Sequence, residues 1–126
     1  MRTSVLLSIK PRFANAILEG TKTFELRRTI FRSRTVHKIV IYATSPVSRV
    51  IGEFLMDGIL ALEPKQLWKV TSGGAGVDRK FFDEYFRGRD IGFALKVDRP
   101  RRYVKPLELK EHYGISRPPQ SFCYLA

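Results

Sequence analysis

The sequence has few of the residues that build metal and redox sites. Its 126 residues include one cysteine, Cys123, and two histidines, His37 and His112. A single cysteine excludes an internal disulfide framework and a cysteine-cluster zinc site, and the two histidines lack metal-ligand spacing. We therefore expect no metal and no cofactor, and we expect Cys123 to be a small buried side chain on a terminal strand. A reducing cytoplasm suits this composition.

Long apolar runs are also missing. No segment approaches the ~18 consecutive apolar residues of a membrane span. The apolar stretch near the N-terminus ends at Lys10 and Pro11, so it predicts a first strand rather than a signal peptide. Hydrophobic residues still make up 44% of the chain and aromatic residues 12%, which is enough for the core of one domain over residues 1–126. We expect no membrane contact and infer no obligate protein partner.

Acidic residues are the third shortage, and this one points to a function. Twelve Asp and Glu face 23 Lys and Arg, for a net charge of +11. Residues 1–50 carry ten basic and two acidic side chains, whereas residues 51–126 carry thirteen and ten. Basic charge gathered in one segment of a small domain is typical of polyanion binding. The alternative is a merely cationic soluble protein, and charge alone does not separate RNA from DNA.

Hydrophobic patterning predicts short strands with three short helices between them. Alternation or β-rich runs indicate strands, whereas i, i+3, i+4 spacing, Pro11 at a helix start, Asp78 as an N-cap and terminal glycines indicate helices. The segment 49–62 fits either a strand pair or one bent strand. We expect an α+β antiparallel barrel with strands at 5–9, 23–28, 38–44, 49–62, 91–97, 103–109 and 120–125, and helices at 11–19, 64–70 and 79–87.

Two further motifs have a structural interpretation. Phe81, Phe82, Tyr85 and Phe86 have helical spacing, which indicates a core-facing side of that helix. The glycine-rich residues 72–76 lack the Gly-Lys-Ser/Thr ending of a phosphate-binding loop, so they indicate a flexible loop.

The most informative motif lies in residues 8–28. Gly20, Lys22, Glu25 and Arg27 follow a strand and a short helix with the spacing Gly-x-Lys-x-x-Glu-x-Arg. Tyr-Ala-Thr-Ser-Pro at 42–46, Gly-Glu-Phe at 52–54 and Arg-Pro-Pro-Gln-Ser-Phe at 117–122 come later in the same order. This set resembles the ASCH domain family of the PUA-like superfamily, most closely the group known as PUA-like predicted regulators. The resemblance implies a small PUA-like antiparallel β-barrel of about five to seven strands with short inserted helices, a cleft between barrel and helices, and RNA binding, with a regulatory role as one form of it.

The residues themselves agree with a cleft at this motif. Glu25 and Arg27 share one face of their strand, and Lys22 precedes it in a turn. The helix that starts near Pro11 has free N–H groups suited to a phosphate, so Lys10, Lys22, Arg27 and Arg28 are candidates to hold one. Glu25 would accept a base amino group, as a carboxylate does from cytosine. The alternative is that Glu25 only pairs with Arg27 or Lys22 on the barrel surface.

The basic stretch 28–38 is a second candidate, in which Phe31 and His37 would stack on bases. Its alternative is an ordinary loop with Phe31 in the core. Lys96, Arg99, Arg101 and Arg102 with Tyr103 form a smaller cluster of the same kind. The matching motifs at 42–46 and 117–122 extend the candidate set. In full, the expected nucleic-acid-binding residues are Lys10, Lys22, Glu25, Arg27, Arg28, Arg32, Arg34, Tyr42, Ser45, Gln120 and Ser121, with RNA favoured over DNA as the partner.

An enzymatic alternative stays open. Some ASCH relatives are amidohydrolases of acylated cytidine that use a lysine and a threonine from this turn and strand. Lys22 matches the lysine, but Glu25 stands at the threonine position, and Thr23 is displaced by about one strand repeat. A metal-independent ribonuclease built on Lys22, Glu25 and Arg27 is the other possibility, because general acid–base cleavage of RNA needs such groups near the 2′-hydroxyl. A small-molecule or protein-interaction domain is the third class.

Overall fold

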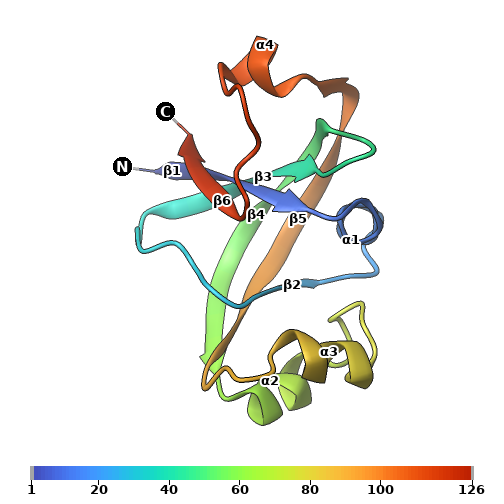
Figure 1. The fold of residues 1–126 in the computed structure, drawn as a ribbon, viewed down its shortest axis with the longest axis vertical. Helices are drawn as coiled ribbons and strands as arrows, with labels where there is room; N and C mark the ends of the chain where they lie inside the picture. The colour runs from blue at the N-terminus through green and yellow to red at the C-terminus, as the bar shows by residue number, and fades with distance from the viewer. Residues whose placement is uncertain (1, 126) are drawn as a thin grey trace.

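The computed structural model describes residues 2–125 as one six-stranded sheet with four short helices (Figure 1). In chain order the elements are β1 (Thr3–Ile9), α1 (Pro11–Glu19), β2 (Phe24–Arg27), β3 (Val36–Ala43), β4 (Arg49–Leu62), α2 (Pro64–Thr71), α3 (Arg79–Tyr85), β5 (Gly92–Leu107), α4 (Leu109–Tyr113) and β6 (Phe122–Leu125). The expected α+β, PUA-like fold is confirmed.

The strand order is β2-β5-β4-β3-β1-β6. β1 and β3 run parallel, and the other neighbours are antiparallel. The expected sheet was antiparallel throughout. It is mixed because α1 and β2 lie between β1 and β3 in the chain and act as a crossover, which returns the chain in the same direction. The sheet is also curled rather than closed by backbone pairing, since β2 and β6 stand at its two edges.

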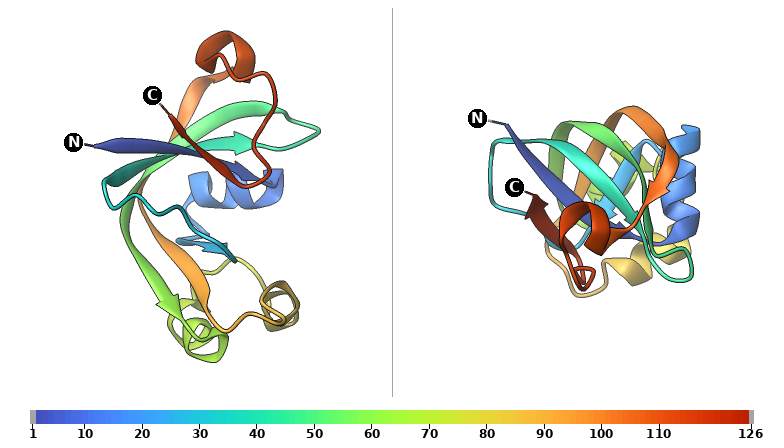
Figure 2. Two further views of the ribbon diagram at one scale, coloured as in Figure 1. Left: turned by 60° about the vertical axis from the view of Figure 1, so that its left-hand side comes forward. Right: turned by 90° about the horizontal axis from the view of Figure 1, so that it is seen from above.

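β4 and β5 run the length of the molecule and give it its curvature (Figures 1 and 2). The 49–62 segment is one strand, and its pairing with β5 shifts register at three places. The two strands expected at 91–97 and 103–109 form a single strand, β5. The last residue of the second expected strand lies instead at the start of helix α4, which was not expected. Asp98-Arg99-Pro100 resembles a break in the sequence, but it lies within the strand, with Arg99 at a φ of 47°.

Three apolar clusters follow from strand alternation. Ile39 and Ile41 face α1 through Ile17, whereas Val40 faces the other way, toward Leu109 of α4. The third cluster seats α2 and α3 on β2 and β5. β2 therefore lies between α1 and α3 (Figure 1). None of the helices described between residues 2 and 125 has the length and apolar character needed to span a membrane.

Candidate nucleic-acid interface

A cavity of about 510 Å³ lies between β2, α1, α3 and the end of β1. Its lining contains one acidic side chain, Glu25, and an excess of basic ones. The basic residues are Lys10, Lys22, Arg27, Arg28 and Arg89, and the aromatic residues are Phe13, Phe81 and Tyr85. The cavity therefore combines positive charge with aromatic surface.

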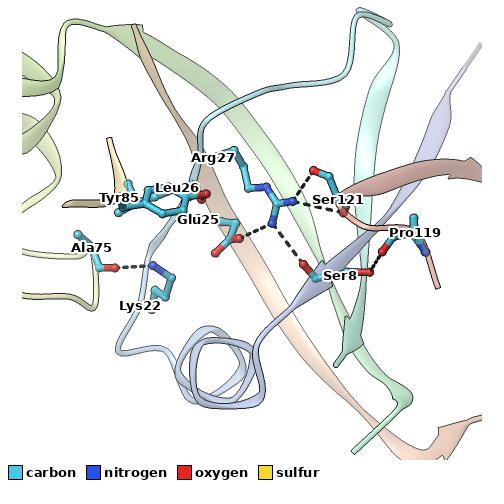
Figure 3. Close-up of polar contacts among 9 residues, drawn as sticks. All are labelled: Ser8, Lys22, Glu25, Leu26, Arg27, Ala75, Tyr85, Pro119 and Ser121. Atoms are coloured by element: carbon cyan, nitrogen blue, oxygen red, sulfur yellow. Dashed lines mark hydrogen bonds and ion pairs between the residues drawn. The ribbon is translucent and has the colours of Figure 1, made fainter. Parts of the chain in front are cut away.

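Arg27 holds the inner end of this cavity together (Figure 3). Its guanidinium donates to the carboxylate Oε2 of Glu25 at 3.1 Å and to the carbonyl of Ser8 at 3.3 Å. It also donates to the Ser121 hydroxyl at 2.6 Å and to the Ser121 carbonyl at 3.3 Å. Because Arg27 belongs to the edge strand β2 and Ser121 lies just before the other edge strand, this one side chain joins the two edges that the backbone leaves unpaired.

Glu25 is nearly buried, at 4% exposure. Figure 3 places its carboxylate between the Arg27 guanidinium and the Lys22 ammonium. Arg27 occupies Oε2, and no hydrogen bond within residues 2–125 involves Oε1. The sequence alternative of a Glu25–Arg27 ion pair is thus present, but it forms part of the cavity lining instead of a solvated surface ladder. Its second oxygen remains available to a ligand.

Lys22 is the most deeply buried charged residue at the site, at 2% exposure. Its ammonium donates to the Ala75 carbonyl and lies 5.2 Å from the centre of the Phe13 ring. Burial lowers the pKa of Lys22, and the negative charge of Glu25 opposes that shift only in part. A buried amine with a lowered pKa gives up its proton more readily than an exposed lysine.

The glycine-rich residues 72–76 supply this carbonyl, and sequence reasoning missed that role. The Gly74 carbonyl accepts from the backbone N–H groups of Thr23 at 2.8 Å and Phe24 at 3.1 Å. A Cβ on Gly74 would lie 2.0 Å from the Thr23 hydroxyl oxygen, and one on Gly76, whose φ is +71°, would lie 3.0 Å from the Lys22 side chain. Instead of a free loop, the segment packs against the start of β2 and fixes Lys22.

One wall of the cavity is aromatic. Phe13 meets Phe81 edge-on at 5.5 Å between ring centres, and Phe81 stacks with Tyr85 at 6.1 Å. The Tyr85 hydroxyl donates to the Leu26 carbonyl at 3.2 Å, and burial raises the pKa of Tyr85. The expectation that all four α3 aromatics are core is correct for Phe82 and Phe86 only. Phe81 and Tyr85 project from the side of α3 that faces the cavity.

Of the eleven expected binding residues, the structure brings together Lys10, Lys22, Glu25, Arg27, Arg28, Gln120 and Ser121. Four lie elsewhere. Tyr42 is 5% exposed in the cluster under α4, and Ser45 is exposed in a turn before Pro46. Arg32 and Arg34 are exposed on the loop before β3, whose backbone donates from Arg32 and Ser33 to the Tyr124 hydroxyl, both at 3.1 Å.

The two proposed stacking residues, Phe31 and His37, are not part of the cavity lining. Phe31 is 4% exposed and packs edge-on against Phe122, which is the core alternative. His37 is half-buried, with Nδ1 3.0 Å from the Thr3 carbonyl. Among residues 2–125, no three His, Cys, Asp or Glu side chains lie close enough together to hold a metal ion.

The fold and the cavity define a small α+β domain with a basic, aromatic-walled site beside its second strand. No protein-family model matches the chain. The ASCH domain-containing ribonuclease of Zymomonas mobilis is 34% identical over 126 residues, which cover 98% of this chain and 85% of that protein. The crystal structure of ASCH from Zymomonas mobilis matches with a TM-score of 0.90 and 31% identity, over 100% of this chain and 90% of the other. The chain belongs to the ASCH domain family.

Other similarities are more distant. The large ribosomal subunit protein uL22 of Ureaplasma parvum is 26% identical over 97% of this chain, but the match covers only 39% of that protein. The N-terminal domain of Staphylothermus marinus McrB matches with a TM-score of 0.53 and 15% identity, over 89% of this chain and 80% of the other. The second similarity shows the fold alone.

Proposed function

We propose that the protein binds single-stranded RNA and holds one nucleotide of the strand in the cavity beside β2. The observation that carries this proposal is the lining of the cavity, in which five basic side chains and three aromatic rings surround one buried carboxylate. A volume of about 510 Å³ lies within the usual range of roughly 300–1,000 Å³ for small-molecule sites. The ribonuclease name of the Zymomonas mobilis relative supports RNA as the partner.

The two halves of the lining suit the two halves of a nucleotide. Lys10, Arg28 and Arg89 are exposed and suit the phosphate, which attracts cations regardless of sequence. Phe81 and Tyr85 present aromatic surface for an unstacked base, which is how single-stranded RNA is usually read. At the inner end, the unpaired Oε1 of Glu25 accepts an amino group from the base edge.

Binding is tested with the purified full chain and labelled single-stranded RNA, duplex RNA and duplex DNA at two salt concentrations. We expect single-stranded RNA to bind best, more weakly at high salt, and several-fold more weakly in an Arg28→Ala variant. Lys65→Ala is the matched control, because Lys65 is an exposed cation on α2 outside the cavity. Equal losses in the two variants, or no binding at low salt, would contradict a defined site.

We place this activity in the cytoplasm, which the single cysteine favours.

A metal-independent ribonuclease is the second candidate, and one observation favours it. Lys22, whose pKa burial lowers, lies in one cavity with the Glu25 carboxylate, so the site holds two groups able to exchange a proton. The amidohydrolase alternative gains no such support, since Thr23 is not part of the cavity lining.

A denaturing gel of the same binding samples separates the two functions. If the protein is a binding module, the RNA remains full length. If the protein is a ribonuclease, the RNA is shortened by the wild-type chain, and Glu25→Gln stops the cleavage without abolishing binding. Glutamine keeps the shape and one acceptor oxygen, so this variant removes charge while leaving an acceptor for Arg27.

A further inference from the structure

A second cavity, of about 360 Å³, lies at α4, at the opposite end of the molecule from α2 and α3 (Figure 1). The proposed function above uses none of the polar residues that line it, which are Ser4, Lys38, Glu53, Tyr103, His112 and Tyr113. Val40 and Leu125 supply an apolar base to the cavity.

The charges in this cavity are arranged around Glu53. Its Oε1 accepts a hydrogen bond from the Tyr103 hydroxyl at 2.8 Å and forms an ion pair with the Arg101 guanidinium at 3.2 Å. Its Oε2 lies 3.8 Å from the Lys38 ammonium. Two cations therefore offset one carboxylate. Burial, together with the hydrogen bond to Glu53, raises the pKa of Tyr103 and keeps its hydroxyl protonated. Because the Lys38 contact is long, its N–H donors remain free for a ligand.

Aromatic rings complete the cavity. His112 is exposed and meets Tyr113 edge-on, with 4.8 Å between ring centres. The Arg101 guanidinium lies 5.2 Å from the centre of the Tyr103 ring. Ring surface with donors and an acceptor nearby suits a heteroaromatic base, which offers a flat face and a polar edge.

The two cavities lie at opposite ends of the same pair of strands. Ser4 and Leu125 line the second cavity, and Ser8 and Ser121 line the first. Ser4 pairs with Leu125 in the β1–β6 ladder, and the Ser8 N–H donates to the Ser121 carbonyl. Ser4 and Ser8 are about 13 Å apart along an extended strand. With a rise of about 3.4 Å per nucleotide, a stacked strand covers this distance in about four nucleotide steps.

We propose that the second cavity is a stacking subsite for a further base of the RNA strand whose first base occupies the cavity beside β2. The proposal rests on the proposed RNA binding and extends it from one nucleotide to a strand path. Tyr113 and His112 stack on the base, Lys38 and Glu53 contact its edge, and Arg101 lies close enough to meet the adjoining phosphate.

The test compares a dinucleotide with an octanucleotide of the same base composition, by competition against a labelled octanucleotide on the full chain. Tyr113→Leu keeps apolar volume but removes the ring, and His112→Ala removes an exposed ring that does not support the fold. We expect each variant to weaken the octanucleotide severalfold, up to about tenfold for Tyr113→Leu, and to leave the dinucleotide unchanged. Lys110→Ala, on the same helix but outside the cavity, is the control for loss of positive charge.

A 4-thiouridine octanucleotide gives an independent readout, because light should crosslink it to the peptide that carries His112 and Tyr113. The subsite is wrong if both variants bind the octanucleotide like wild type, or if they weaken the dinucleotide equally. If the octanucleotide responds to Arg28→Ala alone, the proposed function stands and the second subsite falls. If wild type binds no octanucleotide, the proposed function fails as well.

Discussion

Replacing Arg27 by methionine tests whether the Arg27 guanidinium holds the inner end of the first cavity together. Methionine retains much of the side-chain volume but removes the guanidinium that pairs with Glu25 and joins Ser8 to Ser121. The Glu25 carboxylate then stays in the cavity wall without the guanidinium that pairs with it. We expect a folded but markedly less stable protein.

The size of the effect follows from burial. The two side chains are 12% and 6% exposed, and removing one partner of a buried pair costs about 3–5 kcal/mol. We expect about 3 kcal/mol, at the lower end, because Glu25 borders the cavity. Glu25→Gln should cost about 1 kcal/mol, since an amide oxygen still accepts from Arg27. In the double variant, Arg27→Met with Glu25→Gln, no carboxylate is left unpaired. The double variant should therefore be about 2 kcal/mol more stable than the sum of the two single losses predicts.

Chemical unfolding followed by the fluorescence of Trp68 measures these values. Trp68 is the only tryptophan, and its ring lies 5.1 Å from that of Phe82 in the core under α2 and α3. If the two single losses add to within about 0.5 kcal/mol, the Glu25 and Arg27 side chains do not interact, and Arg27 does not hold the cavity through Glu25.

Three further outcomes are expected. Burial lowers the pKa of Lys22 from 10.5, so just below pH 10.5 the unfolded chain binds more protons than the folded chain. In unfolding titrations, the free energy of unfolding of the wild type should therefore rise relative to that of Lys22→Met as the pH approaches 10.5. Gly74→Ala should lower the free energy of unfolding by about 1–3 kcal/mol through its clash with Thr23, whereas Gly73→Ala, which meets nothing within 4 Å, should leave it nearly unchanged. In RNA titrations, Arg28→Ala should reduce the slope of log K against log salt by about 0.7, and an unchanged slope would remove Arg28 from the phosphate site.

Local sequence predicted the part of the site that lies on one segment. Strand alternation alone places Glu25 and Arg27 on one face, and the preceding turn brings Lys22 beside them. The segment 49–62, which fitted either a strand pair or one bent strand, is the single strand β4. These predictions succeed because the interactions that decide them lie within a few residues along the chain.

The missed features depend on contacts between distant segments. Arg89 and Tyr85 reach the cavity because α3 packs on β2. The Ala75 carbonyl reaches Lys22 because residues 72–76 pack against the start of β2. Tyr42 resembled a site residue by motif, yet strand parity turns it to the α4 face. The sequences of β1 and β3 do not predict that the two strands run parallel, because their relative direction depends on the path of the crossover between them.

The basic residues of the first cavity divide into two kinds, those held by protein oxygens and those exposed to solvent. Lys22 and Arg27 are directed at protein oxygens and are therefore held in place, so they fix the position of Glu25 and the inner end of the cavity. Lys10, Arg28 and Arg89 are exposed, and in the proposed complex their charge is free for phosphate. In the proposed complex, the buried cations govern which base fits, whereas the exposed cations govern the affinity for the strand and its dependence on salt. Loss of an exposed cation should then weaken all sequences alike, whereas a change at the buried pair should alter the preference among bases.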